Sequence, residues 1–84
     1  MRFEDVDVKQ VRAAKAGLPA QYLVTHQGEE LGLIERHKGK ASSWQAYHGI
    51  GQACRYLGAW YGAYVGRIQA RNAVLEAAGL LGAA

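Results

Sequence analysis

The chain has 84 residues, a formal net charge of +3, a single cysteine, and a half share of apolar residues when alanine is counted. A chain of this length builds one domain with a modest core, because it buries only about 60 to 65% of its unfolded surface. These values exclude a second domain and a disulfide-stapled miniprotein, since Cys54 has no partner within the chain.

Charge and apolar runs bear on where the protein works. Eight basic residues follow position 10 against four glutamates, which mildly favours an anionic partner. The first ten residues, MRFEDVDVKQ, lack the apolar stretch of a secretion signal, and the longest run without a charged residue or a histidine has only eleven residues, 56–66. A membrane span needs about 20. We therefore expect a cytoplasmic protein without a membrane span, in the host cytoplasm if a bacteriophage encodes it.

Residues 7–17, DVKQVRAAKAG, satisfy two competing patterns. Asp7 can cap a helix, alanine is dense, and Gly17 followed by Pro19 can end it. The alternation of Val6 and Val8 suits a strand, with GLP as a turn into the next one. The segment is thus predicted as a helix or an extra strand, preceded by an extended or disordered stretch at 1–6.

Three extended segments follow. Residues 21–37 predict a β-hairpin, because QYLVTH and LGLIERH flank the turn letters QGEE. SWQAYH, residues 43–48, predicts a third strand, and ACRYLGAW, residues 53–60, predicts a fourth after a turn at GIGQ. Strands joined by such short turns form an antiparallel meander.

The C-terminal part predicts one helix over 67–78. Ala70, Ala73, Val74 and Ala77 recur at helical spacing, and Gly79 can end the helix before a tail at 80–84. A helix from Leu57 onward that aligns the glycines 58, 62 and 66 is an alternative, but each interior glycine costs about 1 kcal/mol.

The predicted fold class is therefore α+β, a meander of three to four strands packed against a C-terminal helix, in one domain over 1–84. We expect the core to contain the large apolar residues of these segments, namely Tyr22, Leu23, Val24, Leu33, Ile34, Trp44, Leu57, Trp60, Val65, Ile68, Val74 and Leu75.

SWQAYH, a glycine-containing turn, RYLGAW and an alanine-rich helix together resemble a known arrangement. They are similar to the sheet-plus-helix DNA-binding modules of plant ethylene-response factors and of the arm-binding domains of tyrosine integrases, and to small bacteriophage proteins. The resemblance covers about residues 21–78. It implies that Trp44, Ala46 and Leu57 face the helix, whereas Gln45, Tyr47 and Tyr56 face outward. It departs at Tyr47, Tyr56 and Cys54, which occupy outward positions that are largely arginine in the plant modules.

Basic side chains gather where the predicted hairpin ends. Lysine and arginine at a solvent face can contact phosphates, and arginine can also grip guanine edges. We predict a nucleic-acid-binding surface, with double-stranded DNA as the ligand, made of Arg36, His37, Lys38, Lys40, Gln45, Tyr47, Arg55 and Tyr56. The competing interpretation is a solvated, lysine-rich turn that keeps sheet edges from pairing.

The remaining polar residues do not match the spacing of a catalytic or metal site. His26, His37, His48 and Cys54 are separated by eleven, eleven and six positions, without the close pairs of zinc sites. No nucleophile with an orienting base and no phosphate-binding glycine loop is recognisable. We therefore expect no metal, no cofactor and no enzymatic activity.

The alternative function is protein binding through the tyrosine- and glycine-rich stretch after the fourth strand. Tyrosine and tryptophan dominate interface hot spots because they bury a large area at little entropic cost. With Trp44 and Trp60 expected inside, Tyr61 and Tyr64 are the candidates for contact with a bacterial host protein or a second copy in a homodimer.

Overall fold

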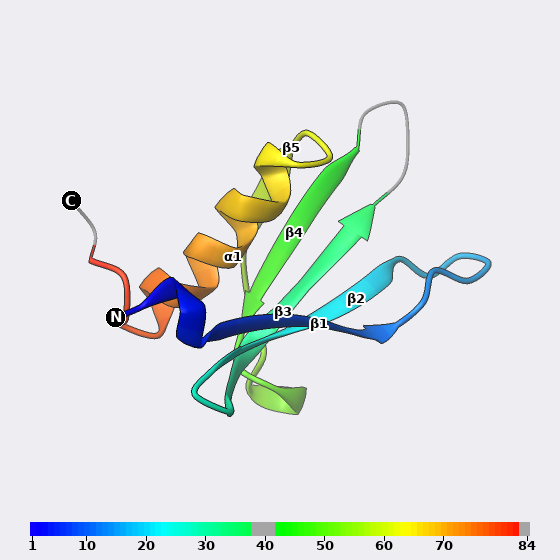
Figure 1. Cartoon of the computed structure of the whole chain (residues 1–84). Coiled ribbons are helices and arrows are strands. Elements are labelled where there is room, and N and C mark those ends of the chain that lie inside the picture. Colours follow the sequence, from blue (N-terminus) through cyan, green and yellow to red (C-terminus); the bar gives the residue numbers. More distant parts are fainter. Residues whose placement is uncertain (38–41, 83–84) are drawn as a thin grey trace.

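The computed structural model describes residues 1–37 and 42–82. In that part of the chain, five strands form one antiparallel sheet in the order β1-β2-β3-β4-β5, followed by one α-helix (Figure 1). The elements are β1 (Val6–Arg12), β2 (Ala20–His26), β3 (Glu29–His37), β4 (Ser43–His48), β5 (Arg55–Tyr61) and α1 (Val65–Ala77). The predicted α+β meander with a C-terminal helix is confirmed.

The N-terminal segment is the extra strand, and the helix predicted for residues 7–17 is wrong. β1 pairs antiparallel with β2, with Val8 opposite Val24 and Val6 opposite His26. Both valines are half-buried against the core, whereas Asp7 between them and Lys9 after them are exposed. The alternation with a period of two therefore prevails over helix propensity, because it places both valines on the sheet face that packs against the core. A short 3₁₀ turn, Phe3–Asp5, precedes the strand.

The central hairpin and third strand lie where the sequence places them. β2 pairs with β3 across the turn at Gln27 and Gly28, both of which have positive φ. β4 pairs with β3, with Trp44 opposite Arg36 and Ala46 opposite Ile34. The alternation along β4 therefore sets Trp44 and Ala46 on the face that packs against α1.

A β-bulge decides the orientation of β5. The register with β4 shifts between Ala46 and Tyr47, so that Trp60 opposes Trp44 while Tyr56 opposes Tyr47. A bulge puts two residues of one strand against one of its partner and so resets the alternation. Trp60 consequently lies on the helix side of the sheet and Tyr56 on the other, as the resemblance implies; Leu57 packs against the core.

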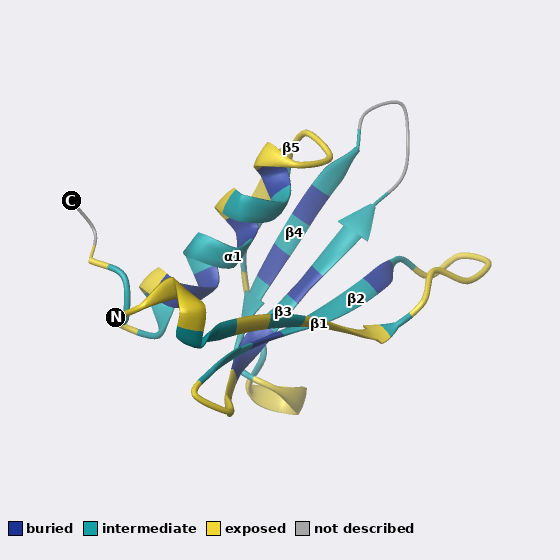
Figure 2. Ribbon diagram, viewed as in Figure 1, coloured by how far each residue is buried: buried dark blue, intermediate teal, exposed yellow. Residues whose placement is uncertain are grey.

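α1 begins two residues earlier than predicted and ends at the expected glycine stop. It packs on β3, β4 and β5, which leaves β1 and β2 beside it rather than under it (Figure 1). Figure 2 shows the buried residues gathered between the sheet and the helix. The largest fully buried side chains are Val24, Ile34, Trp44, Val74 and Leu75.

Not all expected core residues are inside. Val65 is 58% exposed because it is the first residue of α1. Leu23 and Leu33 oppose each other on the sheet face away from the helix, where both are half-buried.

Two glycines allow the backbones to approach closely. A Cβ on Gly32 would overlap the carbonyl oxygen of Tyr47, and one on Gly66 would lie 2.8 Å from that of Trp60. The helix that would align Gly58, Gly62 and Gly66 is not formed, because Gly58 belongs to β5 and only Gly66 to α1. Gly66 is nevertheless needed where α1 meets the sheet.

Candidate functional site

Three of the predicted binding residues meet on the sheet face away from α1, called here the outer face. The Tyr47 hydroxyl donates to Oε1 of Gln45 at 3.2 Å. The rings of Tyr47 and Tyr56 pack with centroids 5.5 Å apart. Gln45, Tyr47 and Tyr56 thus form one polar–aromatic group, on the side that the resemblance implies.

An acidic residue lies beside this group. The Glu35 carboxylate accepts hydrogen bonds from Gln21 at 3.1 Å and from Arg12 at 3.4 Å, and it lies 3.5 Å from Nε2 of His37. Burial, and then the charge of Glu35, raise the pKa of Tyr47. The same two causes, in that order, raise the pKa of Cys54. The negative charge of Glu35 therefore lies close to the predicted binding residues of the outer face, and Arg12 and His37 lie beside it.

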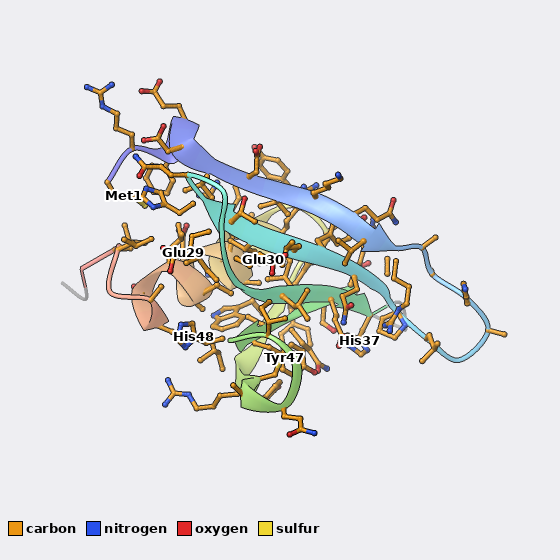
Figure 3. All side chains as sticks on the ribbon, turned by 90° about the horizontal axis from the view of Figure 1, so that it is seen from below. Met1, Glu29, Glu30, His37, Tyr47 and His48 are labelled. Atoms are coloured by element: carbon orange, nitrogen blue, oxygen red, sulfur yellow. The ribbon has the colours of Figure 1, made fainter. Side chains whose placement is uncertain are left out.

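The basic residues predicted to share this surface are dispersed. Arg36 opposes Trp44 in the register and therefore lies on the helix side of the sheet. His37, the next residue in β3, lies on the outer face. Arg55 opposes His48, at the far end of β4 from Trp44. Figure 3 shows His37 and His48 toward opposite ends of the sheet. Lys38 and Lys40 lie outside the described residues.

A more concentrated basic feature lies on the helix side, where three guanidinium groups lie over aromatic rings. The distances from guanidinium carbon to ring centroid are 6.0 Å for Arg36 and Trp44, 5.8 Å for Arg67 and Trp44, 5.3 Å for Arg67 and Tyr22, and 4.8 Å for Arg71 and Phe3. The Tyr22 and Trp44 rings also contact each other, with centroids 5.4 Å apart. We call Arg36, Arg67 and Arg71 with these rings the arginine–aromatic row.

The arginines of this row have few polar partners. Within residues 1–37 and 42–82, no carboxylate lies within 4.0 Å of any of the three guanidinium groups. Arg71 donates to Oδ1 of Asn72 at 2.9 and 3.2 Å, whereas Nε of Arg36 is buried and finds no acceptor in the described chain. Arg67 and Arg71 are only half-buried, so their guanidinium groups can donate to an anion supplied from outside.

Part of the row borders a groove between β1 and α1. This cavity, of about 260 Å³, is lined by Val8, Tyr64, Arg67, Ile68 and Arg71. It exists because α1 covers β3 to β5 and leaves the helix side of β1 and β2 without a second helix. Arg67 and Arg71 line this groove together with the apolar residues Val8 and Ile68, and both arginines are half-buried.

A second cavity, of about 380 Å³, lies at the end of the sheet where β1 turns into β2. Its walls include Lys15, Leu18, Pro19, Arg36 and His37. Two basic side chains and a histidine thus meet at this end, whereas Glu29 and Glu30 lie at the opposite turn (Figure 3).

The tyrosines proposed for protein binding are on the surface. Tyr61 is 71% exposed, Tyr64 is 75% exposed and Val65 is 58% exposed. These three residues surround the connection from β5 to α1 and form an exposed apolar patch.

The sequence contained a signal for the helix part of the row, which our prediction did not use. Arg67 and Arg71 are four positions apart and therefore lie on one face of α1. Their approach to Tyr22 and Phe3, from the distant N-terminal half, could be found only in the folded chain.

In the described chain, no group of three or more histidine, cysteine, aspartate or glutamate residues could hold a metal ion. No helix among those residues is long and apolar enough to cross a membrane.

Comparison with known proteins adds no relative. No protein-family model, no curated protein and no solved structure matches this chain. The class that the fold defines is thus a five-stranded antiparallel sheet packed against a C-terminal helix.

Proposed function

We propose that this chain is a small non-enzymatic nucleic-acid-binding protein, of the kind that the sequence resemblance associates with phages and mobile elements. The observation that carries the proposal is the arginine–aromatic row, because its three guanidinium groups have no carboxylate partner in the described part of the chain. Polyanion binding to such groups releases condensed counterions and is therefore strongly salt-dependent.

Stacking on rings makes these arginines better phosphate ligands than free surface arginines. A guanidinium that lies over an aromatic face has already lost much of its side-chain freedom, and its N–H edge remains available for hydrogen bonds. Arg67, which lies over both Tyr22 and Trp44, is the best-held of the three. The row thus offers ordered donors at a small entropic cost.

The outer face, which the sequence suggests for duplex DNA, is the weaker candidate. Its polar–aromatic group of Gln45, Tyr47 and Tyr56 could contact bases, but Glu35 beside it would repel phosphates. The guanidinium of Arg12 already donates to that carboxylate, and the imidazole of His37 lies beside it.

The test is fluorescence anisotropy of labelled oligonucleotides across a salt series. The double variant Arg67→Gln/Arg71→Gln should bind at least about tenfold more weakly at low salt and should reduce the slope of log K against log salt by about 1.5. The matched control is Lys9→Gln/Lys15→Gln, which removes the same charge from exposed positions outside the row. Circular dichroism checks that both variants are folded.

Two results would overturn the proposal. One is the absence of binding to any oligonucleotide at low salt. The other is an equal loss in the two double variants, because net charge alone would then account for the binding.

Protein binding is the second candidate function, and the exposure of Tyr61 and Val65 favours it. A patch of this kind suits a bacterial host protein or a second copy of the chain. Sedimentation velocity tests the homodimer, and pull-down from a nuclease-treated bacterial lysate tests the host protein. Tyr61→Ser/Val65→Ser should abolish either association. If the unaltered protein sediments as a monomer and retains no stoichiometric partner in the pull-down, this function is contradicted.

A further inference from the structure

We propose that the groove between β1 and α1 binds one unpaired strand of nucleic acid, with Arg67 and Arg71 on neighbouring phosphates and the Tyr64 ring against a base. This inference rests on the proposed nucleic-acid binding and names the form of the ligand and the groove that receives it.

The shape of the groove favours a single strand. Its walls are a strand and a helix that belong to the same packed domain, and its volume is about 260 Å³. Arg67 and Arg71 are only half exposed because each lies over a ring that belongs to another element. A duplex is a stiff rod that would touch only the rim, whereas a flexible strand can enter and reach both guanidinium groups.

The spacing of the two arginines fits a strand that runs along α1. Residues four apart on a helix are separated by about 6 Å along its axis. Both guanidinium groups line the same cavity, so they present two positive charges in a line parallel to the helix. A chain with one negative charge per nucleotide complements that line.

Tyr64 supplies a ring that is free to stack. It lines the same cavity and is 75% exposed, and no other ring or guanidinium group lies against it in the described chain. The rings of Phe3, Tyr22 and Trp44 differ, because an arginine already lies over each of them. Single-strand binders combine these two elements, a basic groove and an open aromatic face.

Val8 and Ile68 provide the apolar part of the groove. They offer contact to sugars and base edges without demanding a hydrogen bond, so we expect little base specificity. An acidic peptide would also satisfy the two arginines, but it would have no use for the exposed, unoccupied ring of Tyr64. The combination of paired charges and a free ring therefore favours nucleic acid.

The experiment compares four probes at one salt concentration: a mixed-sequence DNA strand, an RNA strand of the same sequence, the corresponding DNA duplex, and polyglutamate as a competitor. We expect at least one of the single strands to bind about tenfold or more tightly than the duplex. The ratio between the DNA and RNA strands then identifies the preferred sugar.

The variant that isolates the ring is Tyr64→Leu, which keeps apolar bulk and leaves both arginines in place. It should weaken single-strand binding by about tenfold with an unchanged salt slope, since stacking involves no counterion release. Tyr61→Leu is the matched control, because Tyr61 is 71% exposed but lies outside the cavity. Its affinity should equal that of the unaltered protein.

The failures are distinguishable. If no oligonucleotide binds, the proposed function fails and the inference fails with it. If the duplex binds as tightly as the strands, or if Tyr64→Leu behaves like Tyr61→Leu, the inference fails and nucleic-acid binding stands. Displacement of the strand by polyglutamate at comparable charge concentration would reassign the groove to an acidic peptide.

Discussion

The two faces of the sheet use their charges differently. On the outer face, the carboxylate of Glu35 is engaged by Arg12 and Gln21 and lies close to His37. On the helix side, Arg36 and Arg67 lie over the Trp44 ring, and neither has a carboxylate partner in the described chain. Both faces contain basic residues. What separates them is the position of the acids, which decides where an external anion can be bound.

The two faces also differ in packing. Ile34 and Leu33 are neighbours in β3, but Ile34 is fully buried under α1 whereas Leu33 is half-buried opposite Leu23. The helix side is therefore a core, and the outer face is a surface that contains some apolar residues. Because Leu33 and Ile34 both belong to β3, substituting each of them compares the packing of the two faces directly.

The largest expected effect tests this difference in packing. Ile34→Ala should lower the free energy of unfolding by about 3 kcal/mol, because it removes buried methyl groups and leaves a cavity under α1. Leu33→Ala should lower it by about 1 kcal/mol, since its side chain is already partly in water. Urea denaturation of both variants measures the two changes, provided that their m-values equal that of the unaltered protein.

Equal losses in the two variants would contradict the comparison. They would mean that the outer face is covered as well, by a second copy or by another partner. Repeating the denaturation at several protein concentrations would separate a dimer from a monomer, because only a dimer gains stability with concentration.

Much of the fold was predictable because local signals agreed with each other. The turn at Gln27 and Gly28, the alternation in SWQAYH and the helix stop at Gly79 each combine turn chemistry with the correct period. Residues 7–17 did not have this agreement. Their helix propensity and their valine alternation point to different structures, and only pairing with β2 decides between them.

The candidate site was much less predictable. The β5 bulge and the approach of Arg67 to Tyr22 depend on contacts between segments that are distant in sequence. The basic run from Arg36 to Lys40 looked like one patch, but adjacent residues in a strand point to opposite faces. Arg36 and His37 therefore leave β3 on opposite faces of the sheet and come together only at its end, in the cavity beside Lys15. A count of charges along the chain could not reveal this arrangement.

A smaller effect follows from removing the acid of the outer face. Glu35→Gln should lower stability by about 1 kcal/mol or less, since it weakens a half-buried ion pair with Arg12 and retains part of the hydrogen bonding. It should raise nucleic-acid affinity no more than Glu30→Gln, which removes the same charge from an exposed residue at the start of β3. Denaturation and anisotropy measure the two quantities.

A larger gain in affinity from Glu35→Gln would show that the outer face binds nucleic acid once its negative charge is removed. The triple variant Glu35→Gln/Arg67→Gln/Arg71→Gln shows which face is responsible for this gain in affinity. Binding that recovers in the triple variant would assign the ligand to Tyr47 and its neighbours and would break the distinction between the faces.

The smallest expected effect is a pH dependence that belongs to the outer face alone. Burial and the charge of Glu35 raise the pKa of Tyr47 above its ordinary value of 10.0, so the folded state favours the neutral phenol. The resulting stabilisation is fully present below about pH 10 and is lost as the pH rises through the raised pKa. Cys54 acts with the same sign from its own ordinary value of 9.0, so the measurement uses a Cys54→Ala background. In that background, stability should fall between pH 10 and the alkaline limit, and Tyr47→Phe should make the fall shallower. An unchanged slope in Tyr47→Phe would mean that neither burial nor Glu35 raises the pKa of this phenol, and the electrostatic contrast between the two faces would then rest on the arginines alone.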